Sequence, residues 1–269
     1  MKRYGDDSDD CPVESQPSVS RETATAGQRY VDSMISAEVD RRLSELGERY
    51  RIAGAPIAAL RAILEHQALD DHASTTVREP IAAVDRHVAD SLVALELPEV
   101  RAARSIADLG SGAGWPGIAL AAALPVARVR LVESVGRRAQ YLERVVSACA
   151  LGNVEVVHAR AEEWPAGVEA HDLVTARALA ALPVLCEYAA PLLTEGGRLV
   201  AWKGTVDREE VAQGATAARE LGLEPAGSRA VRPYDGAGTA TLHVYRKVAP
   251  TPARFPRRPG VATKRPLGS

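Results

Sequence analysis

The sequence predicts an α/β fold in which a parallel sheet is covered by helices on both faces. From about residue 104, short apolar runs alternate with helical stretches, which is typical of a parallel sheet. A glycine-rich loop lies between the first of these apolar runs and the helix that follows it. The composition, with 46% hydrophobic and 25% charged residues over 269 positions, is that of a globular protein and excludes a wholly disordered chain.

The residues before this alternation have a different pattern. Residues 1–26 are polar and rich in acids, and we expect them to form a disordered lead. Over residues 27–100, apolar side chains recur at steps of three and four, which predicts a helical cap of two or three helices. The longest apolar run has ten residues and contains Pro125, so we expect no membrane span, and we see no secretory-signal pattern.

The cysteine pattern favours a reducing compartment. Cys11, Cys149 and Cys186 form no CxxC pair, and the His, Asp and Glu residues show no metal-ligand spacing. We therefore expect a cytoplasmic protein without a metal site. Cys149 and Cys186 lie in apolar helical stretches, where we expect them to be small core residues rather than nucleophiles.

Residues 104–248 are expected to form the main domain. We expect its first strands at 105–109, 129–133, 154–158, 172–175 and 198–202, and its helices at 118–124, 137–151, 179–193 and 208–221. Two later β-rich runs, 229–234 and 241–248, flank the turn residues 235–238 and predict an antiparallel hairpin at one edge of the sheet.

The tail, residues 249–269, is basic and rich in proline, which excludes regular structure over most of its length. Residues 245–269 carry seven basic side chains and no acid, which leaves a formal charge of −9 for the rest of a chain whose net charge is −2. Only four of the 33 basic residues are lysines, and arginine suits phosphate and carboxylate recognition. The tail is either a solvated terminus or a contact for phosphate groups.

The most informative motif is the glycine-rich loop, Asp108-Leu109-Gly110-Ser111-Gly112-Ala113-Gly114-Trp115-Pro116-Gly117. Glycines let the backbone approach a ligand closely and adopt positive φ. Residues 112–117 fit the G-x-G-x-x-G pattern of dinucleotide-binding proteins. Asp108, however, lies two residues before the first glycine, and the pattern acid-x-G-x-G-x-G resembles the first motif of S-adenosylmethionine-dependent methyltransferases.

A second acid supports a nucleoside site. Glu133 ends the next predicted strand, 19 residues after Gly114. A carboxylate at this position can accept hydrogen bonds from both hydroxyls of a ribose, whether the ligand is S-adenosylmethionine or NAD. Glu133 therefore indicates a nucleoside cofactor without identifying it, and a tight strand–helix turn without a ligand is the remaining alternative.

Further segments of the chain resemble one family. Together with the loop they are residues 86–92, 133–142, 159–163, 175–178, 202–204, 251–260 and 264–267. This combination resembles the bacterial 16S rRNA guanine-N7 methyltransferases, also called the glucose-inhibited division protein B family, over roughly Arg86 to Leu267. The resemblance implies a Rossmann-like class I methyltransferase domain with a mostly parallel seven-stranded sheet and an N-terminal helical cap. Upstream, residues 66–71 depart from the family's usual aromatic–asparagine segment.

The loop pattern and the resemblance together suggest site residues. The resemblance implies that Ala161 and Glu162 flank the adenine of the cofactor. It also implies that Arg177 contacts the cofactor, and the alternative for Arg177 is a salt bridge to a neighbouring carboxylate. The full set of expected cofactor contacts is Gly110, Gly112, Gly114, Trp115, Glu133, Ala161, Glu162 and Arg177. We expect RNA contacts from Arg160, Lys203, Arg254, Arg257, Arg258, Lys264 and Arg265.

The resemblance also implies the reaction. A methyl group would pass from S-adenosylmethionine to N7 of a guanine in the decoding-region stem-loop of 16S rRNA. N7 carries an in-plane lone pair and no proton, so we expect no catalytic base, and the enzyme can work largely by alignment. An NAD-dependent oxidoreductase and a non-catalytic RNA-binding protein on a methyltransferase fold are the alternatives. We expect 16S rRNA or the small ribosomal subunit as the partner, and no obligate protein partner, no membrane and no metal.

Overall fold

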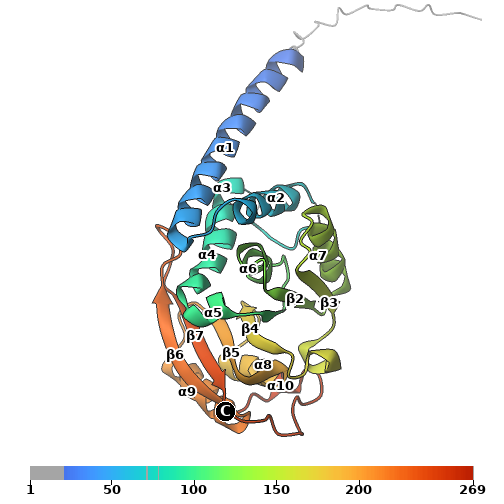
Figure 1. Ribbon diagram of the computed structural model, residues 1–269, viewed down its shortest axis with the longest axis vertical. Coiled ribbons are helices and arrows are strands. Elements are labelled where there is room, and N and C mark those ends of the chain that lie inside the picture. Colours follow the sequence, from blue (N-terminus) through green and yellow to red (C-terminus); the bar gives the residue numbers. More distant parts are fainter. Residues whose placement is uncertain (1–20, 71, 78, 269) are drawn as a thin grey trace, which may run out of the picture. The chain divides into compact units, whose positions relative to one another are not determined.

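The computed structural model describes residues 21–70, 72–77 and 79–268 (Figure 1). Residues up to Ala37 form one unit and those from Glu38 onward form another. The described part of the first unit, residues 21–37, belongs to helix α1 (Arg21–Tyr50). Of the predicted disordered lead, residues 1–20 lie outside the described residues, whereas residues 21–26 are helical and correct that prediction. Glu22, Ala24 and Ala26 have high helix propensity even without an apolar stripe.

The region expected to be a helical cap contains one further long helix and a chain of short helical turns. Pro80 begins the first of these turns, where its missing N–H is not needed, and the Glu79 side chain accepts hydrogen bonds from the next two free backbone amides. The segments are α2 (Ala55–Leu69), α3 (Pro80–Ala83), the π-helical turn η1 (Val84–Ala89), α4 (Asp90–Leu92), η2 (Val93–Glu96) and α5 (Pro98–Ala102).

Seven strands form one sheet in the order β3-β2-β1-β4-β5-β7-β6. Strands β1 to β5 are parallel to their neighbours, and β7 is antiparallel to both β5 and β6. The predicted mostly parallel sheet and its antiparallel edge hairpin are therefore confirmed. The strands are β1 (Ser105–Leu109), β2 (Arg128–Glu133), β3 (Val154–His158), β4 (His171–Arg177), β5 (Leu193–Lys203), β6 (Leu223–Val231) and β7 (Ala240–Lys247).

Helices cover both faces of this sheet (Figure 1). On β1, Ala107 and Leu109 belong to a core that includes side chains of α8 and α9, whereas Asp108 points toward Gly117 at the start of α6. This alternation follows from the two-residue period of a strand, and helices on both faces bury most of β1. The covering helices are α6 (Gly117–Ala123), α7 (Gly136–Ala148), α8 (Leu182–Ala189) and α9 (Arg208–Glu220).

Two strands begin five or more residues before their predicted starts. Strand β6 begins at Leu223 rather than residue 229, because Pro225 and a register shift before Gly227 hide the strand pattern at the sheet edge. Strand β5 begins at Leu193, where a helix was expected to end, because α8 stops at Ala189 and one 3₁₀ turn follows. Pro225 lies in the missed part of β6, and Pro191 lies in the 3₁₀ turn before β5; proline is compatible with strand edges and with helix starts alike.

The tail is irregular except for the single turn α10 (Val261–Lys264), as expected, but it is packed on the domain. Phe255 and Ala262 are buried, and the Arg257 guanidinium contacts the buried Glu187 carboxylate through Nε at 2.9 Å. The buried Lys247 ammonium, just before the tail, donates to the Ala190 carbonyl at 2.6 Å. The described tail is therefore not a free, solvated terminus.

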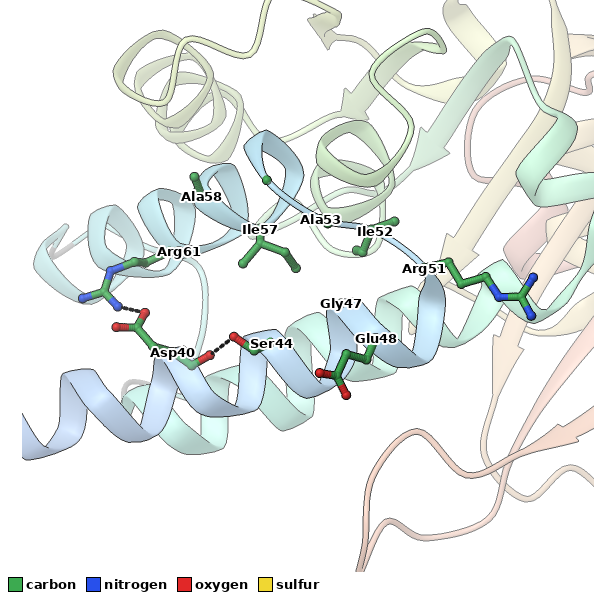
Figure 2. Close-up of a pocket in the computed structure, with 11 residues that line it drawn as sticks. Asp40, Ser44, Gly47, Glu48, Arg51, Ile52, Ala53, Ile57, Ala58 and Arg61 are labelled. Carbon is green, nitrogen blue, oxygen red and sulfur yellow. Dashed lines mark hydrogen bonds and ion pairs between the residues drawn. The ribbon is translucent and has the colours of Figure 1, made fainter.

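A pocket of about 760 Å³ lies between α1 and α2, and it contains none of the predicted site residues (Figure 2). Its wall includes the apolar side chains of Ile52 and Ile57, and its rim carries the ion pair between Arg61 and Asp40. Among the described helices, none is both long and apolar enough to span a membrane.

Candidate active site

The glycine loop connects β1 to α6 with a tightly folded backbone. Gly110, Gly112 and Gly114 have φ values of 64°, 57° and 102°, in the region that side chains disfavour. A Cβ atom on Gly117 would lie 2.5 Å from the Leu131 side chain and 2.6 Å from that of Asp108. The loop therefore requires glycine for its turn and for the close packing of α6 on the sheet.

Asp108 is a buried carboxylate that is only partly satisfied. Its side-chain oxygen Oδ1 accepts a hydrogen bond from the Thr175 hydroxyl at 2.8 Å, and Oδ2 has no hydrogen-bond partner among the described residues. Burial raises the pKa of this carboxyl to about 6, against the hydrogen bonds that favour its charged form. Such groups are costly, and they are concentrated at functional sites.

Glu133 ties the end of β2 to the glycine loop. Its Oε2 accepts from the Gly112 amide at 2.9 Å and its Oε1 accepts from the Val135 amide at 2.8 Å. Because each carboxylate oxygen has two lone pairs, one acceptor position on each oxygen is left over after these contacts. The orientation of Glu133 is fixed, and the carboxylate fits the hydroxyls of a ribose.

The cap contributes a side chain that the sequence did not reveal. The indole N–H of Trp115 donates to Gln67 Oε1 at 2.8 Å, and the Trp115 ring stacks on His87 with centroids 5.4 Å apart. Burial lowers the pKa of His87 to about 4, so the imidazole is neutral at pH 7. Gln67 Nε2 and His87 Nδ1 are buried without partners within the described chain. One sequence feature could have indicated this contact. Gln67 is a polar residue on the same face of α2 as the buried Leu60, Ile63 and Leu64.

Arg177 forms the salt bridge that was the alternative to a cofactor contact. Its guanidinium lies 2.6 Å from the Asp90 carboxylate and also donates to the Arg86 carbonyl in the π-helical turn, at 3.2 Å. Arg177 thus joins the end of β4 to the cap. The next residue, Ala178, has φ of 54°, an uncommon conformation for a residue other than glycine.

The end of β5 carries a second ion pair. The Lys203 ammonium lies 2.7 Å from Glu210 Oε1 and donates to the Ala180 carbonyl at 3.2 Å. Both ion pairs line a pocket of about 320 Å³ at the carboxyl edge of the sheet, where open α/β sheets bind ligands. The sequence did not reveal Asp90 or Glu210, because α4 and α9 supply them from distant parts of the chain.

The predicted adenine residues lie next to the tail. Ala161 and Glu162 belong to the 3₁₀ turn η3 (Ala161–Glu163) after β3, and both are half-buried. Glu162 Oε1 accepts from the Gly260 amide at 3.3 Å. Arg160 is exposed, and its nearest carboxylate partner, Glu163, is 3.9 Å away. The turn after β3 is therefore adjacent both to this edge of the sheet and to the tail.

The basic tail residues separate into two groups. Arg254 is paired with Glu220 at 3.0 Å and Arg257 with Glu187. The other three are exposed, and the described residues provide no ion pair for them: Arg258, Lys264 and Arg265. The structure thus uses Arg257 as an anchor. Within the described residues, no group of three or more His, Cys, Asp or Glu side chains could hold a metal ion.

The seven-stranded sheet with an antiparallel β7, together with the glycine loop and its acid, defines a class I S-adenosylmethionine-dependent methyltransferase. A family model described as rRNA small subunit methyltransferase G matches residues 67–231. The chain belongs to this family, and the resemblance predicted from the sequence is confirmed. The chain is an enzyme of the methyltransferase class rather than an NAD-dependent oxidoreductase.

Two relatives of the same family agree with this assignment. The ribosomal RNA small subunit methyltransferase G of Rubrobacter xylanophilus is 42% identical over 71% of this chain and 75% of its own length. The protein of the same name from Symbiobacterium thermophilum is 35% identical over 84% of this chain and 95% of its own. A solved structure of a predicted O-methyltransferase from Agrobacterium tumefaciens aligns with a TM-score of 0.47 and 25% identity, over 60% of this chain and 80% of that one.

Proposed function

We propose that this chain transfers a methyl group from S-adenosylmethionine to N7 of a guanine in the decoding-region stem-loop of 16S rRNA, in the cytoplasm. The observation that carries the proposal is the glycine loop held by Glu133, in a member of the rRNA small subunit methyltransferase G family. The guanine and the stem-loop follow from the family resemblance.

The loop region offers groups for each part of the cofactor. Glu133 has free acceptor positions for the ribose, and Ala161 and Glu162 lie on the same edge for the adenine. The amino-acid end of the cofactor carries one cation and one anion. The unpartnered Asp108 Oδ2 and Gln67 Nε2 have the acceptor and donor character that these two groups require.

For this methyl transfer, the main task of the protein is to align guanine N7 with the methyl group. When bound, S-adenosylmethionine supplies a methyl group on a positively charged sulfur. The residues of this chain orient the guanine so that N7 lies in line with that methyl group, at about 3–3.5 Å. A general base is not required because N7 carries no proton.

RNA contact is proposed for the cations around this edge. Arg160 and Lys203 lie at the ends of β3 and β5, and the unpaired tail residues Arg258, Lys264 and Arg265 supply further positive charge. Lys203, Arg254 and Arg257 already hold carboxylates, so we assign them a smaller share of the phosphate contacts. The target base must leave its stack to reach the cofactor, as in other enzymes that act on bases.

The test is a methylation assay with labelled methyl donor and small ribosomal subunits, or naked 16S rRNA, that lack the modification. We expect the label in 7-methylguanosine after complete digestion of the RNA. Label in adenine or in protein would contradict the proposal. A Glu133→Ala variant serves as the control, because it should lose cofactor affinity while keeping RNA affinity.

A further inference from the structure

The pocket at the ends of β4 and β5 is polar but carries no excess of positive charge. Its charged lining residues form two pairs, Arg177 with Asp90 and Lys203 with Glu210. Phosphate sites carry an excess of cations, whereas a nucleobase edge presents neutral donors and acceptors side by side. The balanced pocket therefore suits a base better than a phosphate.

The Lys203–Glu210 pair is held rigidly and is not saturated. Lys203 donates to Glu210 and to the Ala180 carbonyl, which leaves one of its three ammonium N–H groups free. Glu210 Oε1 accepts from Lys203 and from the Leu182 amide at 2.9 Å, while Oε2 has no partner within the described structure. The contacts with Ala180 and Leu182 thus hold the free N–H of Lys203 beside the free Oε2 of Glu210.

The Arg177–Asp90 pair joins the cap to the sheet. Arg177 Nη1 makes both of its hydrogen bonds to the cap, one to Asp90 and one to the Arg86 carbonyl. The Trp202 indole, also on the pocket wall, donates to the Asp90 carbonyl at 2.9 Å. These contacts join the cap to the sheet, so the Lys203–Glu210 pair is the one available to a ligand.

A hydrogen-bond donor beside an acceptor complements the Watson–Crick edge of guanine but not that of adenine. The Watson–Crick edge of guanine presents the O6 acceptor next to the N1–H and N2 amino donors, whereas adenine presents an amino donor next to an unprotonated N1. We propose that Lys203 and Glu210 select guanine, with Lys203 donating to O6 and Glu210 accepting from N1–H and the N2 amino group. This leaves N7 unused by the contact and free for the methyl group. The inference rests on the proposed guanine-N7 activity.

The experiment compares 16S rRNA carrying guanine, inosine or adenine at the target position. Inosine keeps O6 and N1–H but lacks the N2 amino group. For the unaltered enzyme we expect kcat/KM to be about 10- to 100-fold higher for guanine than for inosine, because one hydrogen bond to a charged acceptor is lost, and adenine to be inactive. Equal rates for guanine and inosine would overturn the proposal without any variant.

The variant Glu210→Gln separates selection from a structural role. We expect the guanine-to-inosine ratio to fall toward one, while the affinity for S-adenosylmethionine stays unchanged. Glu209→Gln, its exposed neighbour on α9 outside the pocket, is the matched control and should keep the full ratio. If Glu210→Gln lowers both rates equally, or changes neither, Glu210 does not select the base. Failure of the unaltered enzyme to form 7-methylguanosine would instead contradict the proposed function.

Discussion

Several of the buried polar atoms without a hydrogen-bond partner among the described residues lie around the candidate site. Asp108 Oδ2, Gln67 Nε2 and His87 Nδ1 are buried without a partner among the described residues, and all three belong to side chains around the loop. Leaving such groups unpaired costs about 1–3 kcal/mol each. These unpaired atoms destabilise the folded, ligand-free protein, and hydrogen bonds to a polar ligand would remove this destabilisation.

Asp108→Asn should stabilise the ligand-free protein in a pH-dependent way. The folded carboxyl has a pKa of about 6, above its unfolded value of 3.8, so the folded state binds a proton more tightly and its stability falls as pH rises between these values. At pH 8 the full cost of burying the charge is present, up to about 3 kcal/mol, and Asn removes it. Urea unfolding at pH 8 and pH 4.5 measures the gain, which should be largest at pH 8. Equal gains at both pH values would contradict the assignment to this charge.

Gly117→Ala should destabilise the protein although alanine favours helices. The added Cβ would lie 2.5 Å from Leu131 and 2.6 Å from the Asp108 side chain, and overpacking of this kind costs about 1–3 kcal/mol. The helix-propensity gain is at most about 1 kcal/mol. Thermal or urea unfolding gives the net change. Gly152→Ala, where an added Cβ meets nothing within 4 Å, is the control and should be nearly neutral.

At the scale of elements, the carboxyl ends of five parallel strands bring the site together. The strand–helix alternation and the glycine loop are local patterns, so the sequence predicted the sheet, its edge hairpin and the place of Glu133 beside the loop. Gln67, Asp90 and Glu210 could not be found in this way, because their contacts depend on tertiary packing of the cap and α9 onto the sheet. Strand β6 was partly missed because its exposed residues and Pro225 conceal the alternation of an edge strand.

The contact between α8 and the tail is a buried ion pair whose loss should be costly. Glu187 is 1% exposed and is held by the Arg257 guanidinium, so Arg257→Ala would leave a buried charge unpaired, at a cost of about 3–5 kcal/mol. Urea unfolding measures this loss. Arg254→Ala breaks the exposed pair with Glu220 and should cost less than about 1 kcal/mol. The double change of Glu187 and Arg257 to Leu and Met should recover much of the lost stability.

At the scale of the whole molecule, charge and packing have separate roles in the tail. The basic tail follows a chain that is otherwise acidic, yet its Phe255 and Ala262 are buried on the domain. Removing the whole tail would therefore expose apolar surface and leave Glu187 unpaired, which confounds any effect on RNA. Neutralising only the unpaired cations avoids this problem.

The triple variant Arg258→Gln, Lys264→Gln and Arg265→Gln should weaken RNA binding and flatten its dependence on salt. Each phosphate contact to single-stranded RNA contributes about −0.7 to the slope of log K against log salt concentration, so the loss of three contacts should reduce the slope by about 2. Affinity for S-adenosylmethionine should not change, because these side chains are exposed. The control changes Arg51, Arg128 and Arg219, which are also exposed and lie outside the tail, and should leave the slope nearly unaltered. An equal slope for the enzyme and the tail variant would show that the tail packs on the domain without contacting phosphate.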